Sequence, residues 1–304
     1  MQRRLCSRPG SSTTRDSLVN GKLAVVLLFL PPALLLFTLF VVLPMGEAAW
    51  YSVYSWNGYG APENFIGLKN YELLLQDRAF RTALVNNLLI IVVSLAIQLP
   101  LALAMAILLA DRFRGAVTFR MIFFVPYILA EVAAGLIWRF VYDGEYGLVA
   151  SFATTLGFAA PHVLADRDLA MYAILVVIVW KYFGFHMMIY IAGLQQIDTN
   201  LYEAAHIDGA TGRQILWRVT LPLLRPTILL SVFFAVLGSI QFFDLIMPLT
   251  KGGPSDSTQT MVTYLYSYGV TRMRIGFGSA VGVVLFVICV AFAFGYGRIK
   301  APHG

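Results

Sequence analysis

The sequence predicts an all-α integral membrane protein with six transmembrane helices. Composition is the first observation, because 59% of the 304 residues are hydrophobic and only 12% are charged, roughly half the charged share of a soluble domain. Apolar runs long enough to cross about 30 Å of hydrocarbon also recur along the chain. Strands of a membrane barrel would show alternating polarity over about ten residues instead, so helices are the predicted spans.

The predicted spans differ in polarity. The first, second and last contain no charged residue, which argues against a buried helix of a soluble core. The other three contain polar groups, which are costly in hydrocarbon and are expected to face a cavity, a partner helix or each other. The six spans are predicted at residues 23–43, 84–110, 121–142, 169–194, 227–249 and 277–296.

The distribution of Lys and Arg predicts that both termini are cytoplasmic. With the N-terminus inside, thirteen of the 22 basic residues lie in inner segments and eight in outer ones, and cytoplasmic loops retain positive charge. The first apolar run is too long for a signal peptide and lacks a small-x-small cleavage site, so an uncleaved span is predicted. Residues 1–22 are predicted to be a disordered inner tail, 23–298 a six-span domain and 299–304 a second inner tail.

Neither the cysteines nor the net charge indicates a further site. Cys6 and Cys289 fall in the inner tail and the last span, too far apart to bridge, so no disulfide or metal cluster is predicted. The net charge of +6 mostly reflects the cytoplasmic bias, so nucleic-acid binding is not expected.

A polar segment at 198–226 separates the fourth and fifth spans and is predicted to be cytoplasmic. Asp, Thr and Asn at its start are N-cap formers, and Gly209 is placed to end a helix of about two turns. Thr211 and Gln214 resemble the capping box of a second short helix, which is expected to end at the break before Pro222. An interfacial hairpin whose arginines rest on lipid phosphates is the alternative explanation.

The residues of this segment resemble a known motif. The stretch EAAHIDGA at 203–210 is followed after ten residues by Leu-Pro and then by Pro226. This pattern is similar to the EAA motif of permease subunits in bacterial binding-protein-dependent ABC importers. The resemblance implies that the segment is a coupling helix docked in a groove of a cytoplasmic ATPase. The coupling residues that it implies are Glu203, Ala204, Ala205, Asp208, Gly209 and Ala210.

Three other stretches narrow the resemblance. FIGLKNYELLLQDRAF after the first span, FRMIFFVPYILAEVAAGLIWRF at the third and FFDLIMPLTKGGP at the end of the fifth resemble carbohydrate-uptake permeases of the maltose, glycerol-phosphate and multi-sugar type. The chain is similar to the larger maltose-type partner, without its extra N-terminal spans and large outer insertion. The resemblance implies a bacterial inner-membrane protein that moves a mono- or disaccharide or sugar derivative by alternating access.

Partners and energy source are also expectations of the resemblance. No G-x-x-x-x-G-K-[ST] sequence occurs, so no P-loop for ATP is predicted in this chain. The chain is expected to be non-catalytic, with no metal and no cofactor of its own, while ATP and Mg are held by partner ATPase subunits. The expected partners are a second homologous permease, two cytoplasmic ABC ATPases, an extracytoplasmic sugar-binding protein and membrane lipid.

Alignment on the EAA motif and on Gly-Gly-Pro carries the maltose-type sugar contacts onto the fourth and fifth spans. Within each span the positions step by three, four and seven residues, which is one helical stripe. Aromatic faces would stack on a pyranose, Gly238 would leave room and Ser239 would bond hydroxyls. The maltose-type stripe is rich in Asn, so a different sugar is expected here. With flanking positions, the substrate-lining residues are Ile178, Trp180, Lys181, Tyr182, Phe185, Ala235, Gly238, Ser239, Gln241, Phe242 and Asp244.

Two explanations of Lys181 are open at this point. A buried ammonium would attract a phosphate or sulfonate on a sugar, or it would form an internal ion pair with Asp244 or Glu131. Asn86 and Asn87 are predicted to hydrogen-bond neighbouring helices. The sequence therefore leaves open whether the sugar is neutral or anionic.

Two other function classes are weighed against the importer. An ion- or proton-coupled secondary carrier would use Glu131, Lys181 and Asp244 as its coupling site, but it gives no reason for the EAA loop. An intramembrane enzyme would need a nucleophile and a base, and His186 with Ser239 is a weak pair for that role.

Overall fold

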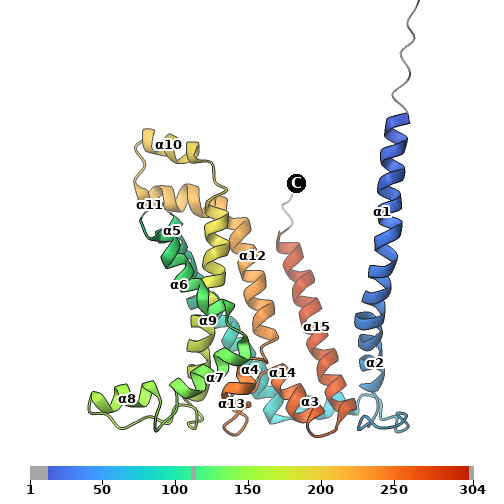
Figure 1. The fold of residues 1–304 in the computed structure, drawn as a ribbon. Helices are drawn as coiled ribbons and strands as arrows, with labels where there is room; N and C mark the ends of the chain where they lie inside the picture. Colours follow the sequence, from blue (N-terminus) through green and yellow to red (C-terminus); the bar gives the residue numbers. More distant parts are fainter. Residues whose placement is uncertain (1–12, 111–113, 301–304) are drawn as a thin grey trace, which may run out of the picture.

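The computed structural model describes residues 13–110 and 114–300, and it shows an all-helical bundle. The α10–α11 loop, the start of α1 and the end of α15 lie at one end of the bundle, which we call the α10 end (Figure 1). The short helices α3, α8, α13 and α14 gather at the other end, the α8 end (Figure 1). Five helices are long and apolar enough to cross a membrane, or six if one bent pair is a single span.

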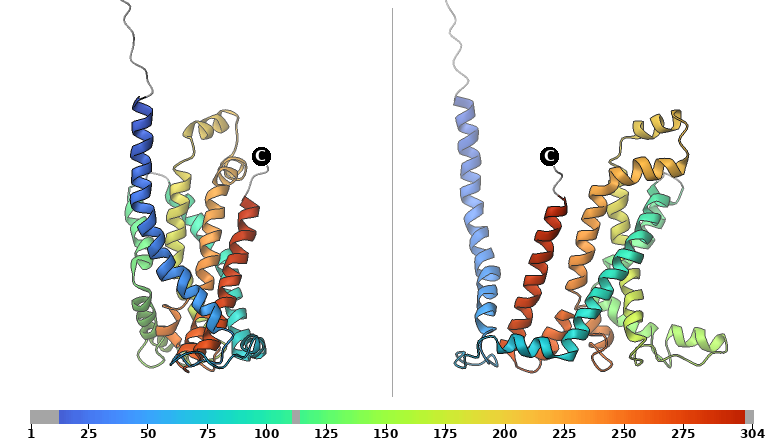
Figure 2. Two further views of the ribbon diagram at one scale, coloured as in Figure 1. Left: turned by 90° about the vertical axis from the view of Figure 1, so that its right-hand side faces the viewer. Right: turned by 180° about the vertical axis from the view of Figure 1, so that it is seen from behind.

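The first span is one continuous helical rod. It consists of α1 (Thr13–Phe37), a π turn (Thr38–Val42) and α2 (Leu43–Tyr51). It begins within the segment predicted to be a disordered tail, whose residues 1–12 lie outside the described residues. The apolar window within 25–51 has a mean hydropathy of 2.8 and none of it is buried. Helix α1 stands apart from the other helices (Figure 2), whereas α2 packs against α15. Lipid or another protein must therefore cover this surface.

The second span follows a short helix at the α8 end. Helix α3 (Lys69–Gln76) leads to Asp77, whose carboxylate accepts hydrogen bonds from the first backbone N–H groups of α4 (Arg78–Val93). Helix α4 continues through a π turn (Ser94–Gln98) into α5 (Leu99–Ala110). The second predicted span is thus confirmed, with a local widening of the helix near its middle.

The third span is not the continuous helix predicted for 121–142. It consists of α6 (Ala116–Ile128) and α7 (Glu131–Val141), which meet at an angle of 96°. Leu129 and Ala130 between them have extended backbones, so α7 turns away from the axis of α6. Helix α8 (Leu148–Thr155) then projects sideways (Figure 1).

Helix α9 (Ala170–Leu194) confirms the fourth predicted span and is the most buried of the spans. It packs against α5, α6 and α12. Gly184 permits the contact with α6, because a Cβ at this position would lie 2.0 Å from the carbonyl oxygen of Phe123. The absence of a side chain there sets how closely α6 and α9 approach.

The fifth span is displaced from the prediction of 227–249. It begins with α11 (Gly212–Ile215), continues through a π turn (Leu216–Thr220) and ends with α12 (Leu221–Ile240). The predicted break before Pro222 is a change of direction (Figure 1) and not an end of the helix. The π turn shifts the hydrogen-bond register just before Pro222, which has no N–H to donate.

The rest of the chain completes the α8 end and the last span. Residues 241–245 are not helical, and α13 (Ile246–Thr250) follows as a separate short helix. Helix α14 (Met261–Tyr264) and a π turn (Leu265–Val270) lead to α15 (Ile275–Lys300), which confirms the sixth predicted span.

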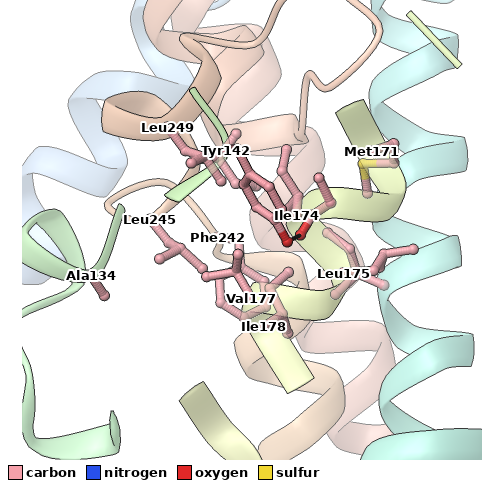
Figure 3. Packing of buried hydrophobic residues seen from close by; sticks show 13 residues of the cluster. Ala134, Tyr142, Met171, Ile174, Leu175, Val177, Ile178, Phe242, Leu245 and Leu249 are labelled. Atoms are coloured by element: carbon pink, nitrogen blue, oxygen red, sulfur yellow. Dashed lines mark hydrogen bonds between the residues drawn. The ribbon is translucent and has the colours of Figure 1, made fainter. Parts of the chain in front are cut away.

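Buried apolar side chains form three clusters. One joins α9 to α7 and α13 near the α8 end, and Figure 3 shows Ile174, Ile178, Phe242 and Leu245 packed together within it. The second joins α4, α14 and α15, and the third joins α5, α9 and α12 near the α10 end. Helix α9 belongs to two of the three clusters, so its position fixes the helices around it.

Candidate functional site

The predicted coupling residues lie on an exposed helical hairpin at the α10 end. Helix α10 (Thr199–Ile207) is capped by Asp198, whose carboxylate accepts a hydrogen bond from the backbone N–H of Asn200 at 3.0 Å. Gly209 has a φ of +74°, a conformation that favours glycine, and it turns the chain towards α11. Thr211 and Gln214 form the predicted capping box at the start of α11.

Most of the coupling residues are open to solvent. Glu203, Ala204, Asp208 and Gly209 are exposed, while Ala205 and Ala210 are half-buried. Sequence reasoning missed Ile207, whose side chain is 86% exposed at the end of α10. Ile207 belongs to the EAAHIDGA motif, but the sequence did not indicate that its apolar side chain is exposed.

A cavity of about 860 Å³ separates this hairpin from the bundle. Tyr202 and His206 of α10 face it from one side, and Arg120 of α6 and the end of α9 from the other. The guanidinium of Arg120 donates to the carbonyls of Leu109 at 2.9 Å and of Ala110 at 3.1 Å, which closes the end of α5. The Thr220 hydroxyl donates to the Tyr202 hydroxyl at 3.5 Å, which joins α10 to the π turn before α12 across this cavity.

A second cavity, of about 560 Å³, lies between the π turn of α4–α5, the bend of α6–α7, and helices α9 and α12. Eight of the predicted substrate-lining residues surround it. They are Tyr182, Phe185, Ala235, Gly238, Ser239, Gln241, Phe242 and Asp244. Whether a solute binds among them stays a prediction.

The other three predicted substrate-lining residues do not line this cavity. Ile178 is 1% exposed and belongs to the apolar cluster of α9 and α13. Trp180 packs edge-on against Trp138, with ring centroids 5.3 Å apart. Lys181 is also 1% exposed and has a separate role in the bend of α6–α7.

Lys181 holds the bend of the third span. Its Nζ lies 3.3 Å from the carbonyl oxygen of Pro126, 3.5 Å from that of Tyr127 and 2.5 Å from that of Leu129. These carbonyls are at the end of α6, where the bend removes the N–H groups that would continue the helix. The ammonium therefore satisfies backbone acceptors, and among the described residues it forms no ion pair with Asp244 or Glu131.

Several cavity residues were not on the predicted list. Ser94 and Gln98 come from the π turn between α4 and α5, and Tyr127 and Glu131 come from the two sides of the bend. The Tyr182 hydroxyl donates a hydrogen bond to Glu131. No residue pattern in the Ser-Leu-Ala-Ile-Gln stretch indicates a π turn, although π turns often occur at functional sites.

Two further polar groups at the cavity, His186 and Ser239, are paired within the chain. His186 Nδ1 lies 2.6 Å from Ser231 Oγ, so the weak pair of His186 with Ser239 does not form. The Ser239 hydroxyl donates to the carbonyl of Ala235 at 2.7 Å. The Tyr127 and Phe185 rings stack with centroids 4.6 Å apart and form an aromatic wall.

Asn87 and Thr260 fix the end of the cavity nearest the α8 end. The Asn87 amide donates to the carbonyl of Ser239 at 2.6 Å and accepts from the backbone N–H of Met261 at 2.8 Å. Thr260 Oγ1 donates to the carbonyl of Phe242 at 2.7 Å. These bonds hold the non-helical segment after α12, and they confirm that Asn87 joins neighbouring segments.

Comparison with known proteins identifies the family. Residues 23–301 match the family model described as binding-protein-dependent transport system inner membrane component. The sulfoquinovosyl glycerol transport system permease protein SmoG of Agrobacterium fabrum is 33% identical over 280 residues, covering 92% of this chain and 91% of that protein. The diacetylchitobiose uptake system permease protein NgcF of Streptomyces coelicolor is 31% identical over 297 residues, covering 93% and 84%.

A solved structure shares the fold. A bacterial ABC transporter involved in the import of the acidic polysaccharide alginate matches with a TM-score of 0.79 and 22% identity, covering 95% of this chain and 100% of that chain. The match of the family model, the curated relatives and the apolar spans together make this a multi-pass protein of the bacterial plasma membrane. The chain belongs to the family of binding-protein-dependent transport system inner membrane components, as a permease subunit of a sugar ABC importer.

Proposed function

We propose that this permease moves a mono- or disaccharide or sugar derivative by alternating access, driven by ATPase subunits that dock on the α10–α11 hairpin. The observation that carries the proposal is the uninterrupted helical backbone from Gly212 to Ile240. Its first residues belong to the hairpin, and Ala235, Leu237, Gly238 and Ser239 near its end line the cavity of about 560 Å³. A displacement of the hairpin is therefore transmitted to the cavity wall along one helix.

The shape of the hairpin suits this role. The exposed Glu203 and Asp208 offer carboxylates for hydrogen bonds, and Ala204 leaves room for close approach of a partner. The exposed Ile207 adds an apolar contact. The cavity of about 860 Å³ behind the hairpin gives it space to move against the bundle.

The proposed assembly contains a second homologous permease, two cytoplasmic ABC ATPases that bind ATP and Mg, and an extracytoplasmic sugar-binding protein. The alginate importer has been solved with a pentasaccharide-bound periplasmic protein, which supports a binding-protein partner for a protein of this fold. The unburied first span supports a large protein or lipid contact along that helix. In this assembly the α10 end is cytoplasmic, and the chain itself is non-catalytic.

Two variants of the hairpin test the coupling. Glu203→Ala removes a carboxylate, and Gly209→Pro removes the N–H that donates to His206 and forbids the φ of +74°. Gly212→Ala is the matched control in the same hairpin, because a Cβ there meets no atom within 4 Å. The measurements are binding-protein-stimulated ATP hydrolysis and sugar uptake by the complete assembly in proteoliposomes.

Loss of a charge-assisted contact in Glu203→Ala, and of the turn conformation in Gly209→Pro, is expected to lower both rates about tenfold or more, while the control keeps them. Normal ATP hydrolysis and uptake in both test variants would remove the coupling role of the hairpin. Uptake by this chain without any ATPase would instead support the secondary carrier that uses Glu131, Lys181 and Asp244.

A further inference from the structure

We infer that the cavity of about 560 Å³ accepts uncharged sugars and excludes anionic ones, with Glu131 and Asp244 as the discriminating residues. This inference rests on the proposed function, because it names the class of solute for the same cavity. It concerns phosphate, sulfonate and carboxylate groups on a sugar, all of which carry negative charge and accept hydrogen bonds.

The charged groups that line the cavity are both acidic. Glu131 begins α7 at the bend of the third span, and Asp244 lies in the non-helical segment after α12, so the two carboxyl groups come from different parts of the chain. The Glu131 carboxyl group is held by the Tyr182 hydroxyl. Among the described residues, Asp244 has no hydrogen-bond or ion-pair partner, and its side chain is exposed.

The nearby cation does not line the cavity. The Lys181 ammonium is buried and directed to carbonyl oxygens at the end of α6, so its hydrogens are not available to a solute. Two carboxylates and one ammonium together leave one net negative charge around the cavity. Like charges repel, and this repulsion is stronger where water is partly excluded.

Hydrogen-bond chemistry favours the same class of solute. Gln98 is 2% exposed, and its Oε1 has no partner among the described residues. The Ser239 hydroxyl has already donated its hydrogen to Ala235, so it offers a solute only its lone pairs. Together with the two carboxyl groups, these oxygens give the cavity acceptors, and the amides of Gln98 and Gln241 with the Tyr127 hydroxyl add donors. The hydroxyls of a neutral sugar donate to acceptors, whereas phosphate and sulfonate oxygens do not.

A charge-selective labelling experiment tests the inference without transport. Gly238→Cys places a thiol in the cavity at a position where a Cβ meets no atom within 4 Å, and Gln241→Cys is a second cavity position. Both are made in the full chain with Cys6 and Cys289 replaced by serine and assembled in the complete complex. Ser151→Cys, exposed on α8, is the reference thiol outside the cavity.

The measurement is the rate of modification by two methanethiosulfonates of similar size, one bearing trimethylammonium and one bearing sulfonate. We expect the ratio of cation to anion rates, divided by the same ratio at the reference thiol, to exceed about tenfold in the cavity. Asp244→Asn or Glu131→Gln is expected to lower this ratio about tenfold, a factor that corresponds to about 1.4 kcal/mol.

Three results would overturn the inference. They are a normalised ratio near one, a preference for the sulfonate reagent, or a high ratio that neither neutralising variant lowers. A failure of the proposed ATPase coupling is distinguishable, because Glu203→Ala lowers ATP hydrolysis and uptake in that proposal but leaves the labelling ratio unchanged. Transport without charge selectivity would therefore reject this inference alone, and selectivity without coupling would reject the proposed function alone.

Discussion

Replacement of Gly184 by alanine is expected to separate α6 from α9. The added Cβ would lie 2.0 Å from the carbonyl oxygen of Phe123 and 2.8 Å from its carbonyl carbon. Both atoms belong to the backbone of α6, so no side-chain rotation relieves the clash. Gly238→Ala in α12 is the matched control, because a Cβ there meets no atom within 4 Å.

The magnitude follows from two opposing effects. Overpacking of a tightly packed interior costs about 3 kcal/mol at the upper end of its usual range, and a contact with rigid backbone belongs at that end. Alanine in a helix gains up to about 1 kcal/mol over glycine. Gly184→Ala is therefore expected to lower the free energy of unfolding by about 2 kcal/mol, while Gly238→Ala leaves it unchanged or raises it by about 1 kcal/mol.

Denaturant unfolding of the purified protein in detergent, followed by tryptophan fluorescence, measures this difference of about 2 to 3 kcal/mol between the two variants. Stability is the readout of this comparison, because Gly238 itself lines the cavity and its replacement can alter sugar uptake directly. Equal stability of Gly184→Ala and Gly238→Ala would refute the reasoning, since it would mean that α6 and α9 do not approach as closely as the structure shows.

Three further perturbations have defined outcomes. Asn87→Leu leaves buried backbone partners without hydrogen bonds, and it should lower the free energy of unfolding by about 3 kcal/mol in the same assay. Thr211→Ala removes the capping box of α11, and it should destabilise that end by about 1 kcal/mol, seen as faster hydrogen exchange in α11 while the other spans are unchanged. Backbone N–H groups in the loop after α7 donate hydrogen bonds to the Asp143 carboxylate and lower its pKa. The ionised carboxylate therefore stabilises the folded state above its ordinary pKa of about 4, and this stabilisation is lost as the pH falls through the lowered pKa. The stability difference between the wild type and Asp143→Ala should accordingly be constant near neutral pH and disappear in acid; an increase in acid would contradict the assigned sign.

Most of the spans were predictable from sequence because hydrocarbon imposes one simple requirement. Every crossing needs a long apolar run with internally bonded backbone, so the runs that gave α4–α5, α9 and α15 were visible in composition alone. The same requirement explains why the capping box at Thr211 was also predictable, because a helix end needs local side-chain partners that are close in sequence.

Where the structure differs from the prediction, the segment is held by hydrogen bonds to residues that are distant in sequence. The segment 241–245 was predicted to be helical because it is apolar, yet Asn87 and Thr260 hold the carbonyls at its start. Neither residue is near the segment in sequence, so no local sequence pattern predicts that α12 ends at Ile240. The cavity exists because this end and the bend of α6–α7 both leave space beside α9.

Only some of the substrate-lining residues that the resemblance implies line the cavity, and the reason is geometric. Helical periodicity places Lys181, Tyr182 and Phe185 near one face of α9, but it does not determine where a long flexible side chain ends. The Lys181 stem reaches the carbonyls that the bend of the third span leaves unpaired. A lone cation in a span is thus as good an indication of a broken neighbouring helix as of a charged ligand. In this chain the bend leaves carbonyls unpaired and Lys181 binds them. The charged side chains that line the cavity are therefore those of Glu131 and Asp244.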